Sequence, residues 1–185
     1  SDVCSSDLFG NVWISKNTGE TWVNISGTTD VFPLINFTTS DITISDNGLI
    51  IGCVTVPSKQ DVGNSFVTKD AGENWTRFPL NQHLNAITCS GDGTKFSIGT
   101  GTNYIYTSLN AGFTFSQQFS SGIREWYAVT ISPDNNLYVA CASWDNVYLS
   151  TDGINWKADP SSGRRQWMDL TVSVDRKSTR LNSSH

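Results

Sequence analysis

Short apolar runs alternate with clusters of Gly, Asn, Asp, Ser and Thr along most of the chain. Residues 41–53, 86–99 and 128–141 share one pattern, in which two apolar runs flank a short polar turn. Asn47-Gly48 and Asp92-Gly93 stand at such turns, where a positive φ is needed. Each unit therefore predicts two antiparallel strands, and a further first strand begins at Trp167. No segment keeps a 3.6-residue apolar period for long, so we expect no helix.

A second motif follows these units and occurs four times, at residues 15–22, 68–75, 108–115 and 150–156. A short Asp or Asn side chain can accept hydrogen bonds from turn amides, and a following Gly can adopt a positive φ. The aromatic residue then starts the last strand and is expected to bury its ring between neighbouring units. We assign this structural role to Ser15, Asn17, Gly19, Trp22, Thr68, Asp70, Gly72, Trp75, Ser108, Asn110, Gly112, Phe115, Ser150, Asp152, Gly153 and Trp156.

The two motifs together predict four antiparallel strands in each repeat of roughly forty residues, which is the blade of a β-propeller. The fold class is therefore all-β: a propeller fragment with three complete four-stranded antiparallel blades and partial blades at both ends. The blades are expected at residues 9–25 (partial), 34–78, 84–118, 126–158 and 167–174 (partial). A propeller usually has four to eight blades, so we expect flanking sequence to supply the others.

The second motif resembles the Asp-box, or BNR, repeat, whose pattern is Ser/Thr-x-Asp-x-Gly-x-Thr-Trp. Asn17 and Asn110 replace Asp, Phe115 replaces Trp, and the fourth copy is one residue short. The resemblance implies a propeller in which each box forms the turn between the third and fourth strands. Proteins with this repeat include sialidases, xyloglucan-degrading glycosidases, sortilin-type receptors and photosystem II assembly factors. The resemblance therefore selects no single activity. It also favours an extracellular or periplasmic location.

Both ends of the chain resemble translated sequencing adapter. Residues 175–185 resemble one reading of a common short-read adapter, and residues 1–8 resemble its reverse complement in another frame. We therefore expect the protein proper to occupy residues 9–174 and exclude both ends from fold reasoning. Cys53, Cys89 and Cys141 then remain, and we interpret them as small buried residues.

Composition narrows the classes of partner. The formal net charge of -5 argues against a surface that follows nucleic-acid phosphates. No run of about eighteen apolar residues exists, so no membrane-spanning segment is expected in this fragment. The sequence has no Cys-x-x-Cys or His-x-x-x-His spacing, and His83 stands alone, so no metal site and no cofactor is expected.

The loops that lead from one blade to the next are the expected site, because alternating strand direction places them opposite the box turns. Residues 120–126 and 161–167 share a pattern with an Arg two positions before a Trp. Arg124 and Arg165 could clamp a carboxylate or sulfate, and Trp126 and Trp167 could stack on a sugar. Glu125 lies beside them. Alternatively, both Trp side chains pack between blades and both Arg side chains pair with neighbouring acids.

The leading functional hypothesis is a non-catalytic binding or scaffolding module for a protein or a carbohydrate. Glycoside hydrolysis normally needs two flanking carboxyl groups, but Glu20 and Glu73 belong to box turns and only Glu125 lies near the expected site. We therefore favour a protein that is not an enzyme. The alternatives are a fragment of a secreted glycoside hydrolase of sialidase or xyloglucanase type and a protein similar to photosystem II assembly factors.

Overall fold

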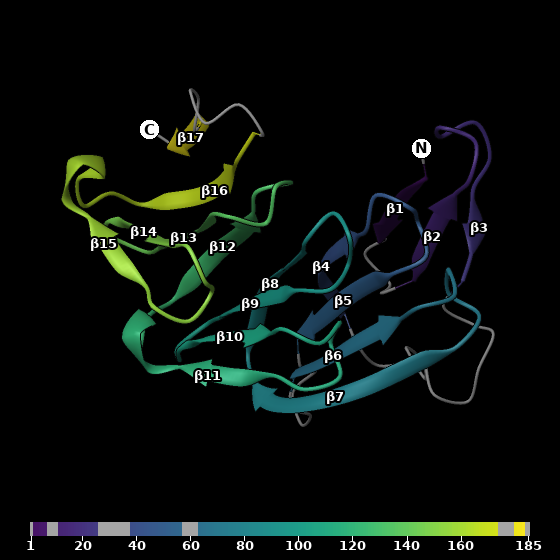
Figure 1. Ribbon diagram of the computed structural model, residues 1–185, viewed down its shortest axis with the longest axis horizontal. Coiled ribbons are helices and arrows are strands. Elements are labelled where there is room, and N and C mark those ends of the chain that lie inside the picture. Colours follow the sequence, from purple (N-terminus) through teal and green to yellow (C-terminus); the bar gives the residue numbers. More distant parts are fainter. Residues whose placement is uncertain (1, 7–10, 26–37, 57–62, 174–179, 184–185) are drawn as a thin grey trace.

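The chain is all-β and folds as consecutive antiparallel sheets (Figure 1). The structure, a computed structural model, describes residues 2–6, 11–25, 38–56, 63–173 and 180–183. In these ranges three sheets have four strands each, and every sheet keeps its strands in chain order. This is the arrangement of propeller blades that the repeats predict. The same ranges contain no helix long and apolar enough to cross a membrane.

The sheets are defined by the following strands. The first contains β1 (Val3–Ser6), β2 (Val12–Ser15) and β3 (Val23–Asn24). The second contains β4 (Thr38–Ile44), β5 (Ile51–Val56), β6 (Gly63–Thr68) and β7 (Trp75–Gln82). The third contains β8 (Leu84–Cys89), β9 (Phe96–Thr100), β10 (Ile105–Ser108) and β11 (Ser116–Gln118). The fourth contains β12 (Trp126–Ile131), β13 (Tyr138–Ala142), β14 (Val147–Ser150) and β15 (Lys157–Asp159). The last pairs β16 (Trp167–Thr171) with β17 (Arg180–Ser183).

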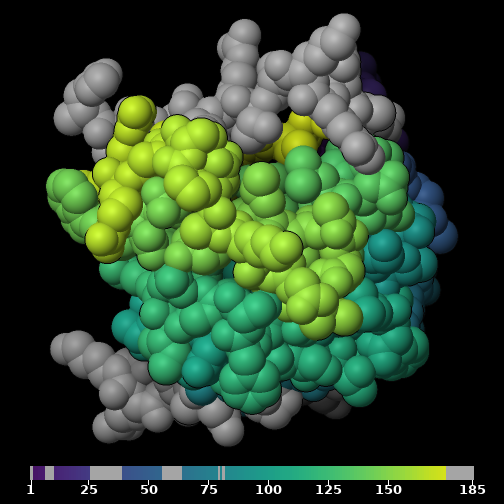
Figure 2. Space-filling view, turned by 60° about the vertical axis from the view of Figure 1, so that its left-hand side comes forward, coloured from purple at the N-terminus to yellow at the C-terminus, as the bar shows by residue number. Residues whose placement is uncertain are grey.

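The first strands of successive sheets lie side by side. Strands β4, β8, β12 and β16 contact one another in turn, and the sheets follow one another around this row (Figure 1). Side chains also link the inner strands: the Ile87 amide donates to Asp41 Oδ2 at 2.8 Å, and the Cys89 amide donates to Thr43 Oγ1 at 3.0 Å. These bonds fix the third sheet against the second, and Figure 2 shows the surfaces of the third sheet (green) and the fourth sheet (yellow-green) in contact.

Apolar side chains fill the space between each pair of neighbouring sheets, so the core is a series of layers. The layer between the third and fourth sheets contains Trp126, Tyr138, Tyr148 and Trp156. The Trp126 and Tyr148 rings meet edge to face with centroids 5.1 Å apart, a favoured aromatic geometry. The three cysteines expected in the core are buried free thiols: Cys53, Cys89 and Cys141.

The four box turns share one set of hydrogen bonds. The Gly amide donates to the hydroxyl that opens each box, for example from Gly72 to Thr68 at 3.0 Å and from Gly153 to Ser150 at 2.9 Å. The carboxylate of Asp152 accepts backbone N–H bonds from Ile154 and Asn155 at 2.8 and 2.7 Å. Hydrogen bonds from Asn155 lower the pKa of Asp152 well below its usual range. Asp70 and Asp152 thus each accept backbone amides of their own turn.

The prediction that every box aromatic is buried is wrong for Trp22, which is 41% exposed. Trp75 and Trp156 are buried, and Phe115 packs edge to face on Phe78 of the preceding sheet and on Phe96 of its own sheet. A box ring is therefore covered largely by the sheet before it. The described residues contain no sheet before β1–β3, so the Trp22 ring has no such cover.

Two short strands lie in the end segments that we expected outside the fold. β1 pairs with β2, and β17 pairs with β16. Both use the free edge of an incomplete sheet, which offers unpaired N–H and C=O groups to any extended segment. The adapter origin of these ends stays a prediction. Two predicted blade starts, at residues 9 and 34, lie outside the described residues. Residues 174–179 also lie outside them.

Candidate functional site

Each sheet has two ends that carry different connections. At one end, which we call the box end, a box turn meets the turn between the first two strands of the sheet. The Ala71 amide donates to the Leu49 carbonyl there at 2.9 Å. At the other, the loop end, Arg124 forms a bridge with Asn103 and Arg165 forms one with Asp145. The loops between blades therefore meet the loops between the second and third strands at the loop end. The first of these loops also reaches the fourth box, because the Ser120 hydroxyl donates to the Ile154 carbonyl at 2.6 Å and accepts the Trp156 amide at 3.0 Å.

The two inter-blade loops are built alike. Each contains a 3-10 turn, Phe119–Ser121 or Pro160–Ser162, followed by a Gly with φ of 72° or 70°. The Ser121 hydroxyl accepts the Ile105 amide at 3.0 Å, and the Ser162 hydroxyl accepts the Val147 amide at 2.9 Å. These bonds fasten each loop to the third strand of its own sheet. The side chains that follow therefore project from a fixed backbone.

Arg124 is held by an acid, which is one of the two roles considered for it. Its Nε lies 2.7 Å from Asp145 Oδ2, its guanidinium carbon lies 4.5 Å from the centre of the Tyr148 ring, and Tyr148 donates to Asp145 at 3.2 Å. Burial opposes ionisation of Asp145, but hydrogen bonds from Arg124 and from the Asn146 amide outweigh it and lower its pKa. Asp145 is thus an ionised partner for Arg124.

Trp126 and Trp167 are both buried, with 0% and 3% exposure. Trp126 Nε1 donates to the Asn103 carbonyl at 3.1 Å, which orients the ring within the layer between two sheets. A buried ring offers no face to a sugar, so neither ring is placed for the stacking role. The packing role, the alternative drawn from the repeated pattern, describes both side chains.

The remaining candidates, Arg165 and Glu125, are exposed. The Arg165 guanidinium carbon lies 5.5 Å from the centre of the Trp167 ring, and Arg165 forms no ion pair with any described residue. Arg164, beside it, donates from Nε to the Trp144 carbonyl at 3.3 Å and lies 3.9 Å from Asp145. Arg164 thus shares Asp145 with Arg124, whereas the Arg165 guanidinium group has no acid partner among the described residues.

Sequence reasoning missed three exposed apolar side chains at the loop end. Trp144 is 66% exposed, Phe119 is 73% exposed and Ile123 is 65% exposed. Trp144 has a φ of 52°, a backbone conformation that costs energy for any residue with a Cβ. One signal was available, since Trp144 lies in the short stretch between the two-strand unit 128–141 and the fourth box at 150–156. We call Phe119, Ile123, Trp144, Arg164 and Arg165 the loop-end patch.

The carboxylates near the loop end already have structural partners. Asp159 accepts the Ser161 amide and hydroxyl at 2.9 and 2.6 Å, and Asp145 is paired with Arg124. Asp41, on inner strand β4, has its pKa raised to about 6 by burial, although it accepts the Ile42 and Ile87 amides. Among the described residues no group of three His, Cys, Asp or Glu side chains could hold a metal ion.

Comparison with known proteins supports the propeller fold. No protein-family model and no curated protein sequence matches the chain. It is similar to the solved structure of a Niastella koreensis GH74 enzyme, with TM-score 0.77 and 14% identity over 98% of this chain and 31% of that chain. It is also similar to the Xanthomonas campestris GH74 xyloglucanase, with TM-score 0.67 and 14% identity over 98% of this chain and 33% of that chain. A third similar structure is YCF48 bound to a D1 peptide, with TM-score 0.64 and 17% identity over 93% of this chain and 54% of that chain. The chain thus spans a third to about half of these similar structures.

Proposed function

We propose that the chain is part of a non-catalytic propeller that binds a protein or glycan partner at the loop-end patch. The observation that carries this proposal is Trp144, an indole exposed by 66% on a backbone with positive φ. A residue in a strained backbone conformation that exposes most of a large apolar ring contributes little packing to its own sheet, so binding is a reason for its presence. Phe119 and Ile123 extend the apolar surface, and Arg165 adds a cation.

Two further observations support binding rather than hydrolysis. The acids of the box turns accept backbone hydrogen bonds, and Asp145 is paired with Arg124, so these carboxylates are committed to structure. A YCF48 protein was solved with a bound D1 peptide, so a propeller of similar fold accommodates a protein ligand. A role similar to photosystem II assembly factors belongs to the same class, because it also requires a protein partner and no turnover.

The experiment is a binding screen of the full chain against peptide and glycan arrays. We expect Trp144→Ala and Arg165→Ala to weaken binding of any retained ligand several-fold. The matched control is Leu109→Ala, which removes a side chain that is 53% exposed at the box end. The same preparation is assayed for hydrolysis of sialosides and xyloglucan. Steady turnover that disappears in Glu125→Gln would refute the proposal, as would binding that survives both patch substitutions.

A fragment of a glycoside hydrolase is the second candidate, and Asp41 is the observation that favours it. A carboxyl group whose pKa is raised to about 6 has the protonation behaviour of a general acid. The GH74 structures supply a similar fold with hydrolase names. This candidate expects turnover of a β-glucan that is lost in Asp41→Asn and retained in Trp144→Ala. Equal turnover in Asp41→Asn and in the unsubstituted chain excludes Asp41 from such chemistry.

A further inference from the structure

One groove recurs beside the box turns of consecutive sheets. Each groove is bounded by the last two strands of one sheet and by the box turn of the next. Corresponding positions line it: Ile14, Lys16 and Ala71 in the first groove match Val67, Lys69 and Ala111 in the second. The grooves are therefore equivalent sites with different side chains.

The residue after the Gly of each box determines how full its groove is. Phe113, whose ring is 59% exposed, lines the second groove, which keeps a volume of about 10 Å³. Ile154 leaves about 320 Å³ in the third groove. Glu73 occupies the same position in the first groove, which keeps about 460 Å³. That volume is within the range of pockets that hold small molecules.

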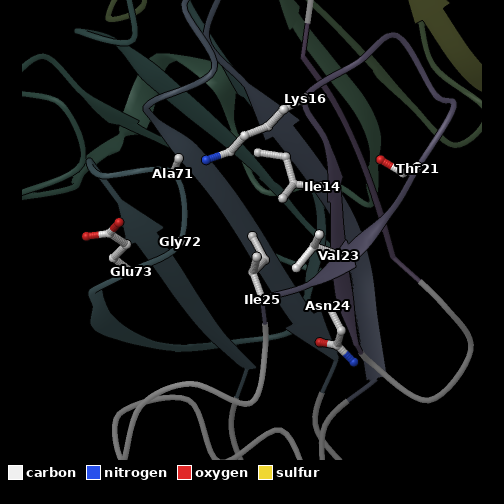
Figure 3. A pocket seen from close by; sticks show the side chains of 9 residues that line it. All are labelled: Ile14, Lys16, Thr21, Val23, Asn24, Ile25, Ala71, Gly72 and Glu73. Carbon is white, nitrogen blue, oxygen red and sulfur yellow. The ribbon is translucent and has the colours of Figure 1, made fainter.

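The first groove is also the apolar one. Ile14, Val23 and Ile25 line it, and of these Val23 is 61% exposed whereas Ile14 and Ile25 are buried. Thr107, Ser116 and Gln118 occupy those positions in the third groove. Figure 3 shows the Lys16 side chain reaching across the first groove toward Ala71, with the Glu73 carboxylate directed away from the apolar side chains. The opening thus has an apolar lining and a cation above it.

In the second groove an aromatic ring lies beneath the corresponding lysine. Lys69, the counterpart of Lys16, places its Nζ 3.0 Å from the centre of the Phe113 ring. A cation over an aromatic face is an attractive arrangement. In the first groove Lys16 has no ring below it, because Glu73 stands where Phe113 stands one blade later. Lys16 also forms no hydrogen bond or ion pair with any described residue.

We infer that the groove between the first two sheets is a binding site for a small, flat aromatic molecule. Its ring would lie on Ile14, Val23 and Ile25 beneath the Lys16 ammonium, in the place that Phe113 fills in the next groove. Contact with the exposed Val23 side chain contributes to binding, and Lys16 favours an aromatic ring over an aliphatic one of equal size. This site is independent of the function proposed for the loop-end patch.

The test uses fluoroindole as the probe, the full chain and fluorine NMR, with backbone amide shifts to locate the ligand. We expect saturable binding that shifts the Ala71 and Gly72 amides. Glu73→Phe fills the groove as Phe113 does and should abolish binding, whereas Glu73→Gln should retain it. The matched control is Glu20→Phe, because Glu20 holds the same position in a box with no groove before it in the described residues. Lys16→Met should weaken binding by about two- to five-fold.

Three results would overturn the inference. They are no saturable binding by the unsubstituted chain, undiminished binding by Glu73→Phe, and amide shifts centred on the loop-end patch. Thermal unfolding of each variant establishes that it is folded. If Glu73→Phe does not fold, the amide shifts of the unsubstituted chain and the affinity of Lys16→Met test the inference instead. Unchanged binding in Lys16→Met would contradict the proposed position of the ring.

Discussion

Trp126 and Trp144 contrast a buried side chain that packs in the core with an exposed side chain on the surface. Trp126 is fully buried, lies edge to face on Tyr148 and donates its indole N–H to the Asn103 carbonyl. Trp144 is mostly exposed. The perturbation is the pair of substitutions Trp126→Ala and Trp144→Ala, made separately in the full chain.

The structure sets the expected magnitudes. Removing a buried Trp ring from a packed layer typically costs about 3–5 kcal/mol of unfolding free energy. For a chain of this size that lowers Tm by roughly 6–20 °C. Trp126→Phe keeps a ring but loses one hydrogen bond, and it should cost about 1–2 kcal/mol. The cost stays small because the Asn103 carbonyl still accepts the Arg124 amide at 3.1 Å. Trp144→Ala keeps the same backbone conformation and should stay within about 0.5 kcal/mol.

Urea unfolding followed by circular dichroism measures these differences without relying on the fluorescence of the residues removed. We expect the order Trp126→Ala, Trp126→Phe, Trp144→Ala from most to least destabilised. Equal destabilisation by the two Ala substitutions would refute the distinction between the two side chains. A cost of less than about 1 kcal/mol for Trp126→Ala would show that the layer between the third and fourth sheets is not a packed core.

Three further predictions follow from the same hydrogen bonds and burial. Asp152→Ala should lower the unfolding free energy by about 1–2 kcal/mol and Asp152→Asn by less, because Asn17 and Asn110 make the same turn in other boxes; chemical denaturation compares them. Arg124→Ala should raise the pKa of Asp145 toward its usual value, seen by carbon-detected NMR; because the folded pKa is now lowered, the stability lost should be largest near neutral pH and shrink as pH falls below about 4. Asp41 should titrate near pH 6 in the same experiment; because its folded pKa is raised, its contribution to stability is greatest below about 4 and declines as pH rises through 6, and titration at its ordinary value would contradict burial as the cause.

The local turns were predictable because their hydrogen bonds join residues close in sequence. The Ser150 hydroxyl, the Asp152 carboxylate and the Gly153 amide meet within four positions, so the motif itself specifies the geometry. The same holds for the hairpin turns, where the Ser90 hydroxyl bonds Asp92 and the Lys95 amide at 2.6 and 3.0 Å. Repetition of these turns then fixed the four-stranded unit and its expected blade bounds.

The candidate site was only partly predictable, because exposure depends on what the neighbouring sheet covers. The sequence marked Trp126 and Trp167 by their spacing from Arg124 and Arg165, but the sheets on either side bury both rings. The pairing of Arg124 with a residue 21 positions later is a contact between loops of one sheet, and no local pattern encodes it.

The amino-acid sequence by itself determined that this chain is a series of four-stranded antiparallel repeats joined by Gly-containing turns. It did so because strand alternation, turn amides and positive φ are properties of a few adjacent residues. Only the tertiary structure decided which aromatic rings are core and which are surface. Trp22 and Trp156 occupy the same place in the same motif, yet one is exposed and the other buried. The physical reason is that the ring is buried by the preceding sheet, which the motif does not contain.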